Sequence, residues 1–470
     1  MNFSFVTDGQ VAADFSQDVW WLWIIKAVLI LVYLLTSVIF VLVFERKVLG
    51  RMQTRRGPNR VGPWGIFQSF ADAPKLLLKE HIWPENVDKA IFFFAPTISA
   101  AAAFTVMAVI PVGPEVSIFG HMTPLQLADS PVSMLFIIGV AALGEYGLVF
   151  GGWSSRSSLP LIGSVRSATQ MISYELALSM ALVTVFLFNG TMSTSGIVAA
   201  QEQLWNVLPM FPAFIVFFIS MFGETNRLPF DLPEAEGEIV AGAHTEYSSM
   251  KFGWYYLSEY TNMFNVSMIG TTVFFGGWRA GPILTWIFSF WDIDPNTGWL
   301  PVLWFTIKIW TFIFVIVWVR ATLVRMRYDT FMKFGWKVLI PIALAWLVLV
   351  MFGKALSTFL NLADIPFIGP ALVVIAQFIA EHRPVVIVIF VVLIIVMLVF
   401  LMAPQEPEGE ETSEDTGFIS PEEEFDAFAG GYPVPPLNGQ ALPPSPRAMR
   451  AAAGVPAAQI ETMSEEASHE

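Results

Sequence analysis

The chain has 470 residues, of which 55% are apolar and only 14% are charged. A soluble chain of this length would divide into two or three domains with charged exteriors, so this composition excludes an ordinary soluble protein. The chain contains no cysteine, which excludes disulfides, iron–sulfur ligation and thiol chemistry within it.

Long apolar stretches with almost no charge recur along the chain. A helix needs about 20 apolar residues to cross roughly 30 Å of hydrocarbon, and lipid offers no partner to an open backbone. The alternating polarity of barrel strands is absent. The sequence therefore predicts an all-α, polytopic transmembrane helix bundle. Its candidate spans are 20–44, 90–112, 132–153, 168–190, 207–222, 260–278, 299–319, 336–352 and 384–403.

The first of these stretches, 20–44, follows an acidic leader that holds Asp8, Asp14 and Asp18. It is longer than the core of a secretory signal, and no small-residue cleavage site follows it. We therefore expect it to be a span rather than a cleaved signal peptide.

The segment after this span is strongly basic. Gly and Pro residues in 51–65 predict turns, and 66–81 predicts an amphipathic helix. Its apolar face holds Ile66, Phe67, Phe70, Pro74, Leu77 and Leu78. Its polar face holds Gln68, Asp72, Lys75 and Lys79. Two interpretations remain open, an interfacial helix in the membrane plane or an ordinary surface helix with a solvated charged face.

Lysine and arginine predict the orientation of the chain. Eighteen of them fall in four segments, whereas the intervening segments hold almost none. We therefore expect the N-terminus outside and the basic segments on the cytoplasmic side of the membrane. The basic segments are 45–89, 154–166, 223–253 and 320–337.

The segment 223–247 reads GETNRLPFDLPEAEGEIVAGAHTEY and is unexpectedly acidic for the basic side. Pro229 and Pro233 favour an extended first half. Its apolar residues, which a solvated linker would not need, favour a packed loop that lines a site; a solvated acidic loop is the alternative. Its acidic residues are Glu224, Asp231, Glu234, Glu236, Glu238 and Glu246.

Charged residues also lie within or at the start of predicted spans, namely Lys26, Glu145, Glu175, Glu259 and Lys308. A charge in the bilayer costs about 3 kcal/mol or more unless it is paired or hydrated. Several such residues together indicate a polar path, and carboxylates suit proton transfer. Buried structural ion pairs are the alternative for any single residue.

Several motifs of catalytic and binding sites are absent from the sequence. It contains no P-loop, no dinucleotide fingerprint and no HExxH, and its five histidines are scattered. We therefore expect no metal site, redox centre or nucleotide site in this chain alone, and no nucleic-acid partner.

The C-terminal part differs in composition. Pro366 and Pro370 interrupt an apolar stretch, so we expect 353–383 to be an external or re-entrant connecting segment, and 384–403 an extra transmembrane helix. Residues 404–470 hold 14 acidic residues against two arginines, which predicts a disordered acidic cytoplasmic tail. A solvated extension is favoured over a docking tail.

Five collinear motifs covering roughly 1–352 resemble the quinone-chamber membrane subunit (mitochondrial subunit 1 type) of respiratory complex I, the proton-translocating NADH-quinone oxidoreductase. They are ERKVLGRMQTRRGPNRVGPWG at 45–65 with ADAPKLLLKE at 71–80, LIGSVRSATQMISYE at 161–175, GETNRLPFDLPEAEGEIVAGAHTEYSSMKFG at 223–253, EYTN at 259–262 and VRMRYDTFMKFGWKVLIP at 324–341. The ninth span and the tail lie outside the resemblance and suggest a bacterial lineage-specific extension.

The resemblance implies an eight-helix subunit at the junction with the peripheral arm. It would form the membrane side of a quinone chamber, with menaquinone or ubiquinone as substrate and no complete active site of its own. Partner subunits would carry FMN and the iron–sulfur clusters. Other implied partners are the peripheral quinone-site subunits, the small and antiporter-like membrane subunits, and membrane lipid.

The resemblance also assigns residues. The quinone chamber would be lined or supported by Arg46, Arg55, Asp72, Glu224, Arg227, Asp231, Glu234, Glu236, Glu238 and Glu246. Glu175 and Glu259 would continue a carboxylate path that couples quinone reduction to proton translocation. Glu145 joins this proposed path because of its position in a predicted span.

Two other functions remain open. One is the homologous membrane subunit of a nickel–iron hydrogenase or of a ferredoxin- or deazaflavin-fed complex, which gives no reason for the full loop 223–253. The other is a stand-alone ion transporter, which would usually show a repeated second half. The loop motifs show no such repeat.

Overall fold

The computed structural model describes residues 13–361 of this chain, except 203, 234–235, 282–284, 286–287 and 289–293. The predicted extra helix at 384–403 and the predicted tail at 404–470 lie outside the described residues. So does most of the predicted connecting segment at 353–383.

The described chain is mainly helical, and six of its helices are long and apolar enough to cross a membrane. They are α1 (Trp20–Met52), α3 (Lys89–Val106), α4 (Ser133–Ser154), α5 (Ser158–Asn189), α11 (Leu300–Thr322) and the run from α12 (Tyr328–Phe334) into α13 (Ile340–Asn361). This confirms the predicted class, a polytopic transmembrane helix bundle. The total of eight or nine spans stays a prediction.

Two predicted spans correspond to helices outside that set. The stretch 207–222 is the apolar but short helix α7 (Phe211–Glu224). The stretch 260–278 falls in α9 (Ser249–Phe274), which packs against α1, α3, α7 and α11. Every residue from Met263 to Phe274 is buried. Because protein rather than lipid surrounds this part of α9, the helix can carry Ser, Thr and Asn where a lipid-facing helix could not.

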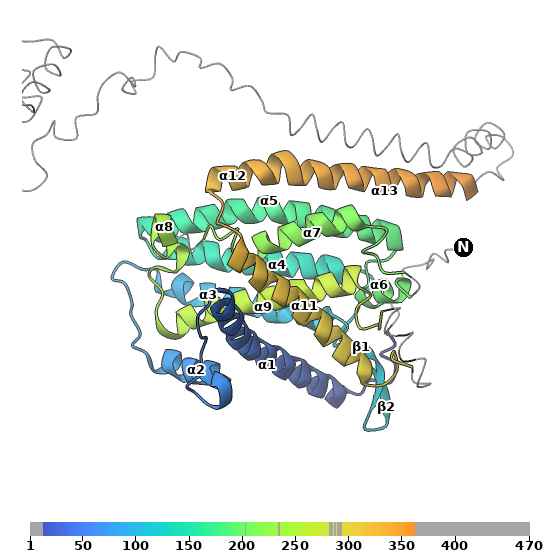
Figure 1. Cartoon of the computed structure of the whole chain (residues 1–470), viewed down its shortest axis with the longest axis horizontal. Helices are drawn as coiled ribbons and strands as arrows, with labels where there is room; N and C mark the ends of the chain where they lie inside the picture. Colours follow the sequence, from blue (N-terminus) through green and yellow to red (C-terminus); the bar gives the residue numbers. More distant parts are fainter. Residues whose placement is uncertain are drawn as a thin grey trace, which may run out of the picture. The chain divides into compact units, whose positions relative to one another are not determined.

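The two ends of the bundle carry different elements and lie at opposite sides of Figure 1. The loop end carries α2 (Gln68–Leu78) and α8 (Glu236–Ile239) within the acidic segment 223–247. The hairpin end carries α6 (Thr194–Ala200) and an antiparallel pair, β1 (Gly113–Ile118) and β2 (His121–Leu125). The sequence did not predict this hairpin, because its strands do not alternate cleanly in polarity.

Close approaches at two glycines set the helix packing near the loop end. A Cβ at Gly147 of α4 would collide with Ser99 of α3, so this glycine lets the two helices touch. A Cβ at Gly163 of α5 would lie only 2.6 Å from the Ala243 backbone nitrogen. Glycine therefore lets the acidic segment rest directly on α5.

Two helix boundaries differ from the sequence-based expectation. Helix α2 begins two residues later than the predicted 66–81 and ends three residues earlier. Its side chains Phe70, Leu77 and Leu78 are exposed. The helix itself is confirmed, while its position in the membrane plane stays a prediction. Helix α13 continues to Asn361, so the predicted connecting segment at 353–383 starts inside a helix.

Candidate functional site

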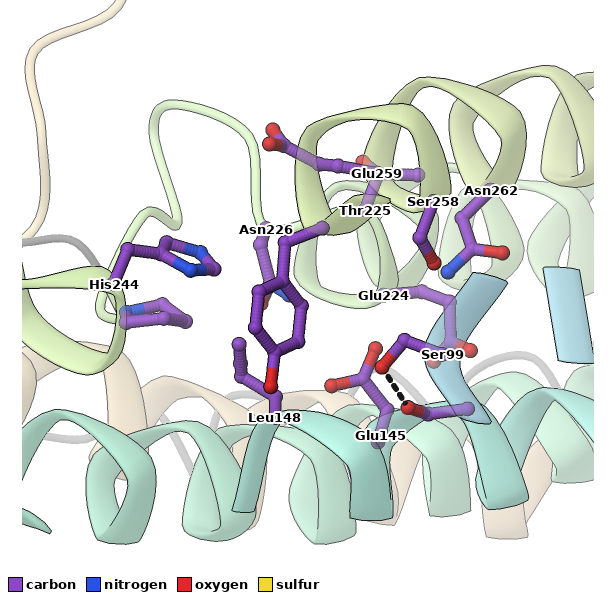
Figure 2. Close-up of a pocket in the computed structure, with 13 residues that line it drawn as sticks. Ser99, Glu145, Leu148, Glu224, Thr225, Asn226, His244, Ser258, Glu259 and Asn262 are labelled. Carbon is purple, nitrogen blue, oxygen red and sulfur yellow. Dashed lines mark hydrogen bonds between the residues drawn. The ribbon is translucent and has the colours of Figure 1, made fainter. Parts of the chain in front are cut away.

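A small cavity of about 40 Å³ lies where the start of the acidic segment meets α4 and α9. Three carboxylates line it, Glu145 from α4, Glu224 from the end of α7 and Glu259 from α9. In Figure 2, the side chains of Glu145 and Glu224 converge beside Ser99, whereas the Glu259 carboxylate points away from them. We call this space the carboxylate cavity.

The packing of α3 against α4 positions the first of these acids. The Ser99 hydroxyl donates a hydrogen bond of 2.6 Å to the Gly144 carbonyl, one residue before Glu145. Glu145 itself is only 8% exposed, and Asn226 lines the same cavity. Glu175 from α5 lies within electrostatic range of Glu145 and of Glu224, although it does not line the cavity.

The acidic segment is fastened at its start by Gln170 of α5. This fully buried amide donates to the backbone oxygens of Gly223 and Phe230 at 2.7 and 3.0 Å, and to the Asn226 side chain at 3.0 Å. Phe230 also packs against Phe331, with ring centroids 4.8 Å apart. These contacts hold Glu224 and Asn226 at the cavity wall.

A buried network of charges adjoins the cavity. Arg227 has its Nε 3.0 Å from Glu259 Oε1 and its Nη1 3.4 Å from Glu45 Oε1. Arg320 of α11 pairs with the same Glu45 oxygen. The Tyr260 hydroxyl donates to the other Glu45 oxygen at 2.5 Å.

This network joins α1, α9, α11 and the acidic segment, and its two acids balance its two arginines. Arg227 and Glu45 are 4% and 3% exposed. Removing Arg227 or Glu45 would leave the remaining buried charges with less compensation. The network therefore ties the wall of the carboxylate cavity to three helices.

A family model described as NADH dehydrogenase matches residues 25–351. The chain belongs to this family. The match runs from α1 into α13 and thus covers the helices that build the carboxylate cavity and the charge network. It confirms the resemblance to the subunit 1 type membrane subunit of complex I, and family membership implies assembly with other complex I subunits.

The structure of this complex I subunit separates the predicted chamber residues into groups. Glu224 lines the carboxylate cavity and Arg227 contacts Glu259 at its edge. Asp231 and Glu246 are partly buried in the acidic segment. Glu234 lies outside the described residues, and the side chain of Glu236 is likewise not described.

Arg46 and Asp72 form a separate pair that joins α1 to α2. Arg46 Nη1 lies 2.7 Å from Asp72 Oδ2, and Gln68 Nε2 donates to the other oxygen at 3.0 Å. Partial burial raises the pKa of the Asp72 carboxyl, but the hydrogen bonds from Arg46 and Gln68 outweigh this and hold the pKa below its usual value. Arg55 is exposed and donates to the nearby Gln53 side chain.

Glu238 anchors the far half of the acidic segment. It pairs with Arg166 of α5 and, at 3.3 Å, with Arg325 after α11. The hydrogen bond from Arg166 lowers the pKa of the Glu238 carboxyl, and the charge of Arg325 adds to this effect. Glu238 therefore fixes the loop rather than lining the carboxylate cavity.

The intramembrane lysines have local partners. Lys26 pairs with Asp18 and donates to the Thr123 hydroxyl at 2.8 Å. Lys308 donates to the backbone oxygens of Phe275, Gly277 and Arg279 at 2.6, 2.9 and 2.6 Å. It thereby satisfies carbonyls at and beyond the C-terminal end of α9. Lys26 thus forms a structural ion pair, whereas Lys308 is held by backbone carbonyls.

Sequence reasoning missed Glu45, Arg320, Gln170 and Asn226. Glu45 and Arg320 each stand at the end of an apolar stretch, where the sequence suggested only a membrane boundary. The one sequence sign of a pairing at Glu45 was an acid directly beside Arg46 and Lys47 at the end of an apolar stretch. Among the described residues, no group of three or more His, Cys, Asp or Glu could hold a metal ion.

Proposed function

We propose that this chain forms the membrane side of the quinone chamber in a proton-translocating NADH-quinone oxidoreductase. In this proposal its buried carboxylates couple quinone reduction to proton translocation. The observation that carries the proposal is the carboxylate cavity, in which Glu145 and Glu224 converge beside the anchored start of the acidic segment. Family membership supports the oxidoreductase complex, and the carboxylates of the cavity are the groups that would bind and release protons.

Quinone reduction consumes two electrons and two protons, so a negative charge entering the chamber must be matched by protons. Carboxyls that interact electrostatically titrate as a set, because ionising one opposes ionising the next. Glu145 and Glu224 converge in one cavity and are placed to interact in this way. In this proposal, a change of charge near one of them shifts the protonation of the other.

The charge network offers a route by which the chamber could influence these acids. Arg227 holds Glu259 on one side and Glu45 on the other. A charge that forms near the acidic segment would pull on Arg227 and weaken its contact with Glu259. Glu259 lines the carboxylate cavity, so the same displacement would alter the electrostatics around Glu224.

The test is Glu224→Gln in the assembled complex, with Asp231→Asn beside it. Quinone reductase turnover should fall by about tenfold or more, since a positioned acid–base group contributes at least that much. Electron transfer from NADH to ferricyanide, which needs only the peripheral arm, should survive. Glu115→Gln makes the same chemical change at an exposed position on β1 and should leave turnover unchanged. Normal quinone turnover in both Glu224→Gln and Asp231→Asn would refute the assignment.

Co-purification in mild detergent tests the complex itself. Soluble subunits carrying FMN and iron–sulfur clusters should accompany this chain. A nickel–iron subunit in their place would support the hydrogenase-type alternative. Menaquinone and ubiquinone can then be compared as substrates of the purified assembly.

A further inference from the structure

Glu224 also borders a second cavity, whose lining includes no residue of the acidic segment after Glu224. This inner cavity has a volume of about 30 Å³ and lies among α3, α4, α5, α7 and α9. Its wall is mostly apolar, with Ile137 and Ala141 of α4 and Ile269 of α9 among its residues. Glu224 and Asn262 line both the inner cavity and the carboxylate cavity.

Two residues that line the inner cavity carry polar atoms without a hydrogen-bond partner among the described residues. Glu224 Oε2 and Asn265 Oδ1 are buried and have no hydrogen-bond partner among the residues that the structure describes. Asn265 is 3% exposed, and its Nδ2 donates to the Ala103 carbonyl at 2.7 Å, which fixes the amide. A buried acceptor without a donor is costly, and ordered water usually supplies the donor in such sites.

The dimensions suit water. A cavity needs about 10–15 Å³ to hold one water molecule, and the molecule needs two to four polar partners. The inner cavity has room for about two on this measure. Glu224, Asn262 and Asn265 provide the polar partners, while the apolar walls exclude anything larger or charged.

We propose that the inner cavity is an internal hydration site whose water joins Glu224 to Asn265. Water can donate to the ionised carboxylate and accept from the protonated carboxyl, so it supports both forms without movement of the side chain. Asn265 carries no proton itself and acts as a positioning residue for this water. The inference rests on the proposed function, in which Glu224 changes protonation during turnover.

Filling the inner cavity tests the proposal without removing a polar group. Ala141→Leu would occupy it, while Ala142→Leu, on the next residue of α4 and outside the cavity lining, is the matched control. A high-resolution cryo-electron microscopy map of the assembled wild-type complex should show water density between Glu224 Oε2 and Asn265 Oδ1. Ala141→Leu should abolish this density and lower quinone turnover roughly threefold or more, and Ala142→Leu should change neither.

A kinetic readout separates hydration from mere packing. If proton transfer at Glu224 becomes slower, the solvent deuterium isotope effect on quinone turnover should rise in Ala141→Leu and in Asn265→Leu. Asn265→Ser, which keeps a polar hydroxyl, should retain the wild-type isotope effect. An empty inner cavity in the wild-type map, or an unchanged isotope effect in both leucine variants, would overturn the proposal.

Glu224→Gln distinguishes this failure from a failure of the proposed function. Impaired Glu224→Gln with normal Ala141→Leu would remove only the hydration site. Normal turnover in Glu224→Gln would remove the role of Glu224 and the hydration proposal together.

Discussion

The loop end and the hairpin end of the bundle both contain charged groups at membrane depth, but they treat them differently. At the hairpin end, Lys26 and Lys308 each satisfy their hydrogen bonds with fixed local partners. Toward the loop end, Glu145 and Glu224 face a cavity, and one oxygen of Glu224 has no partner among the described residues. The difference is one of hydrogen-bonding capacity: the two lysines use theirs on fixed partners, whereas Glu224 retains an oxygen without a partner among the described residues.

The largest effect is expected from a substitution in the charge network. Arg227→Met would leave Glu45 and Glu259 with less compensation, and breaking a buried pair in this way costs about 3–5 kcal/mol. We expect loss of quinone turnover and weaker assembly, measured by native gel electrophoresis and thermal unfolding of the complex. Arg279→Met, whose partner Glu202 is 72% exposed, is the control and should change assembly little.

Lys308→Met should lower the stability of the fold without lowering quinone turnover. The substitution removes three hydrogen bonds to backbone oxygens near the end of α9. Because these buried carbonyls would then lack a donor, we expect the free energy of unfolding to fall by about 1–3 kcal/mol. Thermal unfolding should occur at a lower temperature, while quinone turnover per assembled complex stays normal. Reduced turnover at normal stability would show that the hairpin end also participates in coupling.

Glu238→Gln tests whether Glu238 anchors the acidic segment without taking part in the carboxylate cavity. Arg166 and Arg325 hold the pKa of Glu238 below its usual value. Their contribution to loop stability is therefore present at neutral pH and is lost as the pH falls through this lowered pKa. Glu238 is partly exposed, so its ion pairs contribute only about 1 kcal/mol or less.

Hydrogen exchange of the acidic segment provides the measurement. Exchange in 223–247 should be faster in Glu238→Gln than in the wild type at pH 7, and the difference should shrink in acid. Quinone turnover should change much less than in Glu224→Gln. Identical exchange in the two proteins at pH 7 would exclude the anchoring role.

Deletion of 405–470 should have the smallest effect. The family match ends at residue 351, and we expect the predicted acidic tail to be a solvated extension. Quinone turnover and subunit composition should both be normal after the deletion. Failure of the truncated chain to assemble would instead identify the tail as a docking element.

The sequence predicted the bundle because long apolar runs have few alternatives in lipid. It did not delimit α9 correctly, since a helix surrounded by protein tolerates Ser, Thr and Asn. The pairing of Glu45 with Arg320 joins residues 275 positions apart, and no local pattern reports such a contact. Glu224 and Glu259 were found through motifs and Glu145 through its place in a span, yet only the packing of α4, α7 and α9 brings them to one cavity.

The pairing of Lys26 with Asp18 has a consequence for biogenesis. The two residues are eight positions apart at the start of the first helix, so they can meet while the rest of the chain is still being synthesised. A charged lysine within an apolar helix would otherwise oppose insertion of that helix until a later segment arrived. The first helix can therefore enter the bilayer with its charge already neutralised, and the hairpin residue Thr123 adds its hydrogen bond afterwards.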